Sequence, residues 1–207
     1  MSKDTAISWT HSTFNPWHGC VKVSPACTNC YAERDSQRFF ATPLWGPNSR
    51  RRFFGDKYWA EPLKWNAAAK KASERRRVFC ASMADVCELL PNKHPDHLRL
   101  GKECERLTEL ISETPWLDWL LLTKRPENFF DSFPWWNDGC PNNVWFGASV
   151  ENQKYADERI PMLLQIPARI RFLSCEPLLG IINLEPWIDD IDWVIAGGES
   201  GPNARPM

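Results

Sequence analysis

The chain has 207 residues, 43% of them hydrophobic, which is enough for one sizeable core, so we expect a single domain over residues 1–207. Its 25 basic and 26 acidic side chains give a formal net charge of −1, which argues against a protein that binds nucleic acid with its whole surface. No apolar run reaches the about 20 residues that cross a bilayer, and the first five residues form no basic and apolar leader. These features predict a cytoplasmic protein without membrane contact.

Six short apolar, β-branched or aromatic runs end in small and polar residues, as buried parallel strands do where they leave a sheet. The expected strands are, in chain order, 7–9 (the weakest), 78–82, 119–123, 144–149, 170–174 and 193–198. Helix-like stretches lie between them, over 61–76, 98–113 and 152–164. Because parallel neighbours need a crossover connection, this alternation predicts an α/β fold with a parallel sheet, and six strands suit a partial (β/α)6 barrel similar to a TIM barrel.

Polar side chains follow the five stronger strand runs, at the point where each run ends. They occur in the segments Ser82-Met83-Ala84-Asp85, Thr123-Lys124-Arg125-Pro126, Ser149-Val150-Glu151-Asn152, Ser174-Cys175-Glu176-Pro177 and Gly198-Glu199-Ser200-Gly201. Ordinary turns and helix caps also favour Ser, Thr, Asp and Asn, so one such end carries little information. The carboxyl ends of parallel strands meet at one face, where such folds bind ligands. Five polar ends, three of them with Glu, therefore predict a shared pocket.

Three of the eight cysteines, Cys20, Cys27 and Cys30, fall within eleven residues after the first expected strand. Without an export signal, cysteines are expected as reduced thiols or metal ligands rather than disulfides. A structural zinc site takes four ligands, and the nearest candidates for a fourth are His18 and His11. Three thiolates on a [4Fe–4S] cluster instead leave one iron open, where S-adenosylmethionine (SAM) can bind and be cleaved to a carbon radical. We expect the iron–sulfur cluster.

Several motifs in this order resemble one known family. They are Gly19-Cys20 with Cys27-Thr28-Asn29-Cys30-Tyr31-Ala32-Glu33, and the segments at 122–128, 147–152, 173–178 and 197–201. Together they resemble the phage-borne three-Cys-motif family, which carries a domain of unknown function assigned to the radical SAM superfamily. The resemblance covers essentially the whole chain and implies a radical-SAM-like partial barrel, a phage or prophage gene, a cluster on the three cysteines and SAM as a second cofactor. It also implies a dedicated partner protein and an electron donor, but no substrate.

A SAM site needs an acceptor for the methionine ammonium and polar contacts for the ribose and the carboxylate. The candidates for the ammonium are Glu199, Glu176 and Ser174, and the further candidates are Ser82, Asp85, Ser149 and Asn152. Lys124 and Arg125 suit a substrate carboxylate or phosphate, because paired cations at a pocket rim bind oxyanions. Cys175 lies at a strand end beside Glu176 and is a candidate hydrogen-atom donor to a radical. We expect the catalytic side chains to be Glu176, Lys124 and Cys175.

A run of three arginines, Arg50–Arg52, lies among aromatic residues. Its aromatic neighbours are Trp45, Phe53, Phe54, Tyr58 and Trp59. Arginine interleaved with aromatic rings is typical of surfaces that bind single-stranded nucleic acid, since the rings stack on bases and the cations follow phosphates. Charge runs are more often solvated faces, so local nucleic-acid contact is one of two interpretations of this run.

Three functions are consistent with these patterns. The leading hypothesis is a radical-SAM-like enzyme of unidentified substrate that modifies or repairs a nucleic acid or a nucleotide-like molecule. The second is a non-catalytic, metal-stabilised phage protein that acts on a host or partner protein. Two features keep this second hypothesis open. Six residues separate Cys20 from Cys27, where the usual radical SAM signature has three. Family members also continue beyond residue 201 with a further helix and strand, so we expect this chain to be a C-terminally shortened form. The third is a zinc hydrolase with Glu33, Glu151 or Glu176 as its base.

Overall fold

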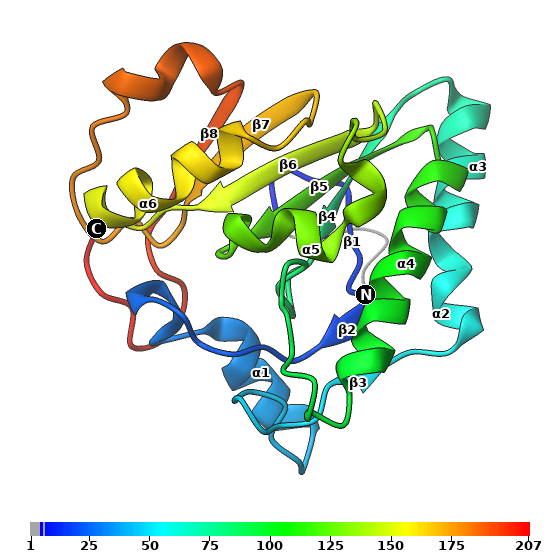
Figure 1. Cartoon of the computed structure of the whole chain (residues 1–207), viewed down its shortest axis with the longest axis horizontal. Helices are drawn as coiled ribbons and strands as arrows, with labels where there is room; N and C mark the ends of the chain where they lie inside the picture. The colour runs from blue at the N-terminus through cyan, green and yellow to red at the C-terminus, as the bar shows by residue number, and fades with distance from the viewer. Residues whose placement is uncertain (1–4, 6) are drawn as a thin grey trace.

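The computed structural model describes residue 5 and residues 7–207, and its centre is a six-stranded sheet (Figure 1). The strands are β1 Ser12–Thr13, β4 Arg76–Cys80, β5 Leu117–Thr123, β6 Val144–Ser149, β7 Ile170–Cys175 and β8 Trp193–Ala196. They lie in the order β1-β4-β5-β6-β7-β8, and every neighbouring pair is parallel. The sheet curls into a half-barrel, which confirms the predicted α/β fold.

Helices connect the strands and cover one face of the sheet (Figure 1). The longer ones are α3 Glu61–Ala72, α4 His97–Glu113 and α6 Gln153–Leu164. The short ones are α1 Tyr31–Phe39, α2 Asp56–Trp59 and α5 Phe129–Ser132, with 3-10 turns η1 Pro25–Cys27, η2 Pro126–Asn128, η3 Pro134–Trp136 and η4 Glu185–Asp190. The predicted helix over 61–76 is too long, because Ser73 takes a left-handed φ of 54° that ends α3 before β4 begins.

The first strand begins later than the sequence predicts. Residues 7–9 lead into a turn, in which the Thr10 amide donates to the Ile7 carbonyl (3.3 Å), so the predicted strand at 7–9 is wrong. The strand is instead the pair Ser12–Thr13, which lies beside β4. Both of its side chains are buried but polar, so no apolar pattern marks it in the sequence.

The two faces of the sheet carry different side chains, because successive strand residues point to opposite sides. The face under the helices forms a large apolar core that includes Val78, Cys80, Trp119, Leu121, Phe146 and Leu173. The concave face carries a smaller cluster of Leu120, Phe172 and Ile195, with Trp9, Leu122, Trp145 and Trp193 packed against it. Trp9 contacts both Phe79 of β4 and Trp193 of β8, with ring centroids 4.7 and 6.2 Å apart, although these strands are not neighbours in the sheet. We define the aromatic floor as Trp9, Phe79, Trp145, Phe172 and Trp193.

A second, antiparallel sheet pairs β2 Trp17–His18 with β3 Arg52–Phe53. The chain between these two strands contains all three clustered cysteines and α1, and it lies at one end of the large sheet (Figure 1). Within the described part of the chain, we find no helix that is long and apolar enough to span a membrane.

Candidate functional site

A cavity of about 680 Å³ lies at the carboxyl ends of the parallel strands. The cysteine loop, which we define as residues 19–30, forms one part of its wall, and Trp9 and Phe79 of the aromatic floor form another. The predicted site residues on the wall are Cys20, Cys27, Cys30, Ser82, Asp85, Lys124, Ser149, Ser174, Glu176 and Glu199. The structure therefore brings the ends of five strands and the three cysteines together at one cavity.

Two predicted site residues are not among the described residues of the wall. Asn152 caps α6, since its side-chain oxygen accepts a hydrogen bond from the Tyr155 amide (3.3 Å). Cys175 is 4% exposed and belongs to the core under the helices, and burial, together with the charge of Glu176, raises the pKa of its thiol to about 11. The structure thus gives each residue a local structural role, and their predicted roles in the site stay predictions.

The three cysteines approach the cavity from different local structures. Cys20 forms an isolated bridge with Trp45, Cys27 ends η1, and Cys30 directly precedes α1, and all three are free thiols. Across residues 5 and 7–207, no group of three or more His, Cys, Asp or Glu side chains is gathered to hold one metal ion. A zinc ion needs its ligands at about 2.0–2.3 Å from one point, whereas a [4Fe–4S] cluster binds each cysteine at a different iron. All three thiols line the same cavity, which is the arrangement that a cluster with three cysteine ligands requires.

Cys20 lies against a buried ion pair. Arg125, just after β5, places two nitrogens 3.7 and 3.8 Å from the Cys20 sulfur and donates to the Val21 carbonyl (2.6 Å). Asp85 lies 2.8 Å from the same guanidinium. Burial acts to raise the pKa of Asp85, but Arg125 and hydrogen bonds from the end of β5 outweigh burial and hold this pKa below its usual value. Burial raises the pKa of the Cys20 thiol to about 12, against the opposing charge of Arg125.

The Cys27 end of the loop rests on a second buried ion pair. Glu151, after β6, is 1% exposed and lies 2.8 Å from Arg159 of α6. Its other oxygen accepts a hydrogen bond from the Ala26 amide (3.4 Å), directly before Cys27. Both carboxylate oxygens of Glu151 are thus bonded within the protein, which does not favour the role of a hydrolytic base.

The C-terminal segment forms a third ion pair against the loop. Glu199, after β8, pairs with Arg205 and accepts a hydrogen bond from the Asn29 side chain (2.8 Å). Arg205 also donates to the Pro25 carbonyl (3.0 Å), so this segment lies beside the cysteine loop, red against blue in Figure 1. Hydrogen bonds from Arg205 lower the pKa of Glu199 to about 2. A ligand ammonium at Glu199 would therefore have to compete with Arg205.

Glu176 and Lys124 are the two charged side chains of the wall that have no ion-pair partner among the described residues. Burial raises the pKa of Glu176, and a hydrogen bond with Ser174 opposes this shift. Gly197 leaves room for this carboxylate, since a Cβ there would lie 2.5 Å from Glu176 Oε1. Glu176 and Lys124 are therefore the wall charges with the best access to a ligand.

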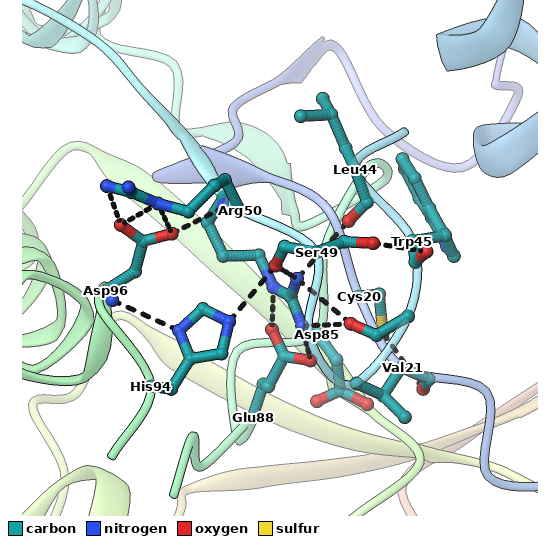
Figure 2. Close-up of polar contacts among 12 residues, drawn as sticks. Cys20, Val21, Leu44, Trp45, Ser49, Arg50, Asp85, Glu88, His94 and Asp96 are labelled. Atoms are coloured by element: carbon teal, nitrogen blue, oxygen red, sulfur yellow. Dashed lines mark hydrogen bonds and ion pairs between the residues drawn. The ribbon is translucent and has the colours of Figure 1, made fainter. Parts of the chain in front are cut away.

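The side chains of the arginine run Arg50–Arg52 make ion pairs, hydrogen bonds and ring contacts within the protein, most of them drawn in Figure 2. Arg51 is 4% exposed and pairs with Glu88 (2.7 Å), while Arg50 pairs with Asp96 (2.6 Å). Arg51 also donates to the carbonyls of Leu44 and Ser49, and these bonds hold the 44–49 segment beside Cys20. Arg52 stacks on Phe40, with its guanidinium carbon 4.2 Å from the ring centroid. A buried Arg51 is out of reach of a phosphate group, whereas Arg50, although paired with Asp96, and Arg52 are both exposed.

Sequence reasoning missed the residues that position the cysteine loop. They are Asn29, Glu151, Arg159 and Arg205, together with Arg125 in its contact with Cys20. Asn29 lies within the cysteine motif, so its position between two cysteines was a usable signal. Arg159 lies in the middle of a helix, where a charged residue is ordinarily solvent-facing, and no local pattern marks it as buried.

The half-barrel has a counterpart among solved structures. Among solved structures, "Spore photoproduct lyase complexed with dinucleoside spore photoproduct" is similar, with a TM-score of 0.55 and 15% sequence identity. The match covers 89% of this chain and 50% of that one, so this chain spans about half the length of that protein. At this identity the likeness shows the fold alone, a curled half-barrel similar to a radical SAM enzyme fold.

The sequence places the chain within a particular family. The profile of the family described as "Protein of unknown function (DUF5131)" matches residues 4–207, and the chain belongs to that family. No curated protein matches the sequence. The function must therefore be argued from the site.

Proposed function

We propose that the protein is a radical SAM-type enzyme that holds a [4Fe–4S] cluster on Cys20, Cys27 and Cys30. The observation that carries the proposal is the position of three free thiols on the wall of one cavity, at the carboxyl ends of a half-barrel. With its open iron, such a cluster would bind SAM and supply the electron that cleaves it to a carbon radical. The residues of this chain would hold the cluster, orient SAM and shield both from solvent.

The remaining side chains of the wall suit different parts of SAM and the substrate. Glu176 would accept the methionine ammonium, because Glu199 is already bound to Arg205. The hydroxyl groups that would contact the ribose and the carboxylate are those of Ser82, Ser149 and Ser174. Lys124 would hold an oxyanion of the substrate as a point charge.

The substrate that fits this cavity best is a nucleic acid or a nucleotide-like molecule. Lys124 suits a phosphate, and the rings of Trp9 and Phe79 offer an apolar surface on which a base can pack. Spore photoproduct lyase, which shares the fold, has been solved with a dinucleoside spore photoproduct. The proposal includes a phage or prophage gene and a dedicated partner protein. It also includes an electron donor, since reductive cleavage needs an electron from outside the chain.

Anaerobic reconstitution with iron and sulfide tests this function. The wild-type protein should turn brown and release 5′-deoxyadenosine from SAM under reduction. Cys20→Ser, Cys27→Ser and Cys30→Ser should each lose most of the iron, because each removes a ligand. Cys140→Ser, at a half-buried thiol away from the described cavity wall, is the matched control and should keep it. A colourless reconstituted wild-type protein would exclude the cluster.

A second candidate is a metal-stabilised binding protein. It is favoured by the way three internal ion pairs hold the cysteine loop, as in a segment built for structure rather than for chemistry. In that case the anaerobically purified protein should contain stoichiometric zinc and no iron. A chelator should then lower its melting temperature, and SAM should not change its spectrum.

A further inference from the structure

Arg125 is a cation in direct contact with a cysteine sulfur. Its side chain is 9% exposed, and two of its nitrogens lie 3.7 and 3.8 Å from the Cys20 sulfur. Cys27 has a different neighbour, the Ser24 hydroxyl at 3.9 Å, and no contact in the described part of the chain gives Cys27 or Cys30 a cationic donor. The three thiols of the loop therefore differ in their electrostatic surroundings.

The orientation of the guanidinium is fixed by its other partners. Asp85 lies 2.8 Å from one nitrogen, and the Val21 carbonyl accepts from another (2.6 Å). Asp85 is itself held, because it accepts hydrogen bonds from the Thr123 hydroxyl (2.6 Å) and the Lys124 amide (3.0 Å). These partners fix the planar guanidinium beside the Cys20 sulfur.

A buried cation beside a ligand sulfur changes the balance between the oxidation states of a metal centre. Reduction adds negative charge to a cluster, and a nearby positive charge stabilises the reduced state, strongly so where water is excluded. Hydrogen bonds to a ligand sulfur act in the same direction. Asp85 opposes this effect, but it contacts the guanidinium rather than the sulfur.

We propose that Arg125 is a positioning residue of the cysteine site, which fixes the Cys20 sulfur and raises the reduction potential of the cluster bound there. This inference rests on the proposed function and adds to it a residue that tunes the cluster. Arg159 and Arg205 also support the loop, but through Glu151 and backbone carbonyls, without a contact to sulfur.

A redox titration of the anaerobically reconstituted full chain, followed by electron paramagnetic resonance, tests this role. Arg125→Gln should lower the equilibrium constant for reduction at least tenfold, a shift of about 59 mV to more negative potential for one electron. Arg205→Gln also removes one positive charge beside the cysteine loop, but at a residue that contacts the Pro25 carbonyl rather than a sulfur, and it should give a clearly smaller shift. Asp85→Asn should shift the potential to more positive values, because the guanidinium then loses the opposing charge.

The outcomes separate this inference from the function on which it rests. A wild-type protein that binds no iron overturns both. A wild-type cluster with an unchanged potential in Arg125→Gln, or with an equal shift in Arg205→Gln, overturns only the role of Arg125. If Arg125→Gln retains no cluster, Asp85→Asn decides: a more positive potential supports the role, and an unchanged or more negative one overturns it.

Discussion

Different interactions stabilise two regions of the half-barrel. One is the mouth, where the parallel strands end and the cysteine loop lies, and the other is the aromatic floor. At the mouth, three ion pairs each contact a different part of the cysteine loop, namely Asp85–Arg125, Glu151–Arg159 and Glu199–Arg205. At the aromatic floor, Trp9 packs against Phe79 of β4 and Trp193 of β8, two strands that are not neighbours in the sheet. In the same curled sheet, ion pairs therefore stabilise the mouth, and apolar packing stabilises the floor.

This difference shows what each end contributes. Apolar packing responds to volume and shape and is insensitive to charge. Buried ion pairs have a demanding geometry and contribute little net stability, but removing one partner leaves a costly unpaired charge. We therefore expect substitutions at the floor to change the free energy of unfolding, and substitutions at the mouth to change the placement of the thiols, metal retention and pH dependence.

The largest effect on stability is expected at the floor, from Phe172→Ala. The Phe172 ring is fully buried and lies against Gly147, where an added Cβ would be 2.5 Å from it. Truncation should lower the free energy of unfolding by about 3–5 kcal/mol, as measured by urea denaturation. Phe172→Leu, the milder control, should cost less. A loss below about 1 kcal/mol would mean that the floor is not a packed core.

Glu151→Gln at the mouth should lower the free energy of unfolding less than Phe172→Ala does, but it should have a larger effect on iron retention. The change removes the negative charge that pairs with the buried Arg159 guanidinium and leaves it a neutral acceptor, which should cost about 1.5–3 kcal/mol. It also weakens the bond to the Ala26 amide, so the reconstituted protein should lose iron faster to a chelator. Glu158→Gln removes an exposed carboxylate that is 3.8 Å from Lys154. This control should change stability by less than about 0.5 kcal/mol and leave iron loss unchanged.

Much of the fold could be predicted from the sequence, because its strands are apolar runs of ordinary length. The strand over 144–149 is found with the predicted bounds, and helix α4 begins one residue before the predicted range. The pattern fails at β1, where two buried polar residues take the place of an apolar run. It also fails after Ala72, where a single left-handed residue rather than a change in hydrophobicity ends the helix.

The location of the candidate site could be predicted from the sequence, but the ion pairs among its charged side chains could not. Parallel strand ends must meet at one edge, so Ser82, Lys124 and Glu176 could be placed at one cavity from their position after strands. Which charges are already paired depends on contacts between distant parts of the chain, such as Arg51 with Glu88. Sequence patterns hold no distances, so a buried arginine and a solvated one look alike.

The smallest effect should appear in the pH dependence of the mouth. Since the pKa of Glu199 is lowered from about 4.5 to about 2, its ionised form is favoured in the folded protein. The contribution of the Glu199–Arg205 pair is then fully present above pH 4.5 and is lost as the pH falls toward about 2. Urea denaturation across this range should show the stability deficit of Glu199→Gln shrinking toward low pH. The deficit of the floor variant Phe172→Leu should stay constant, and a constant deficit for Glu199→Gln as well would contradict the ionised pair.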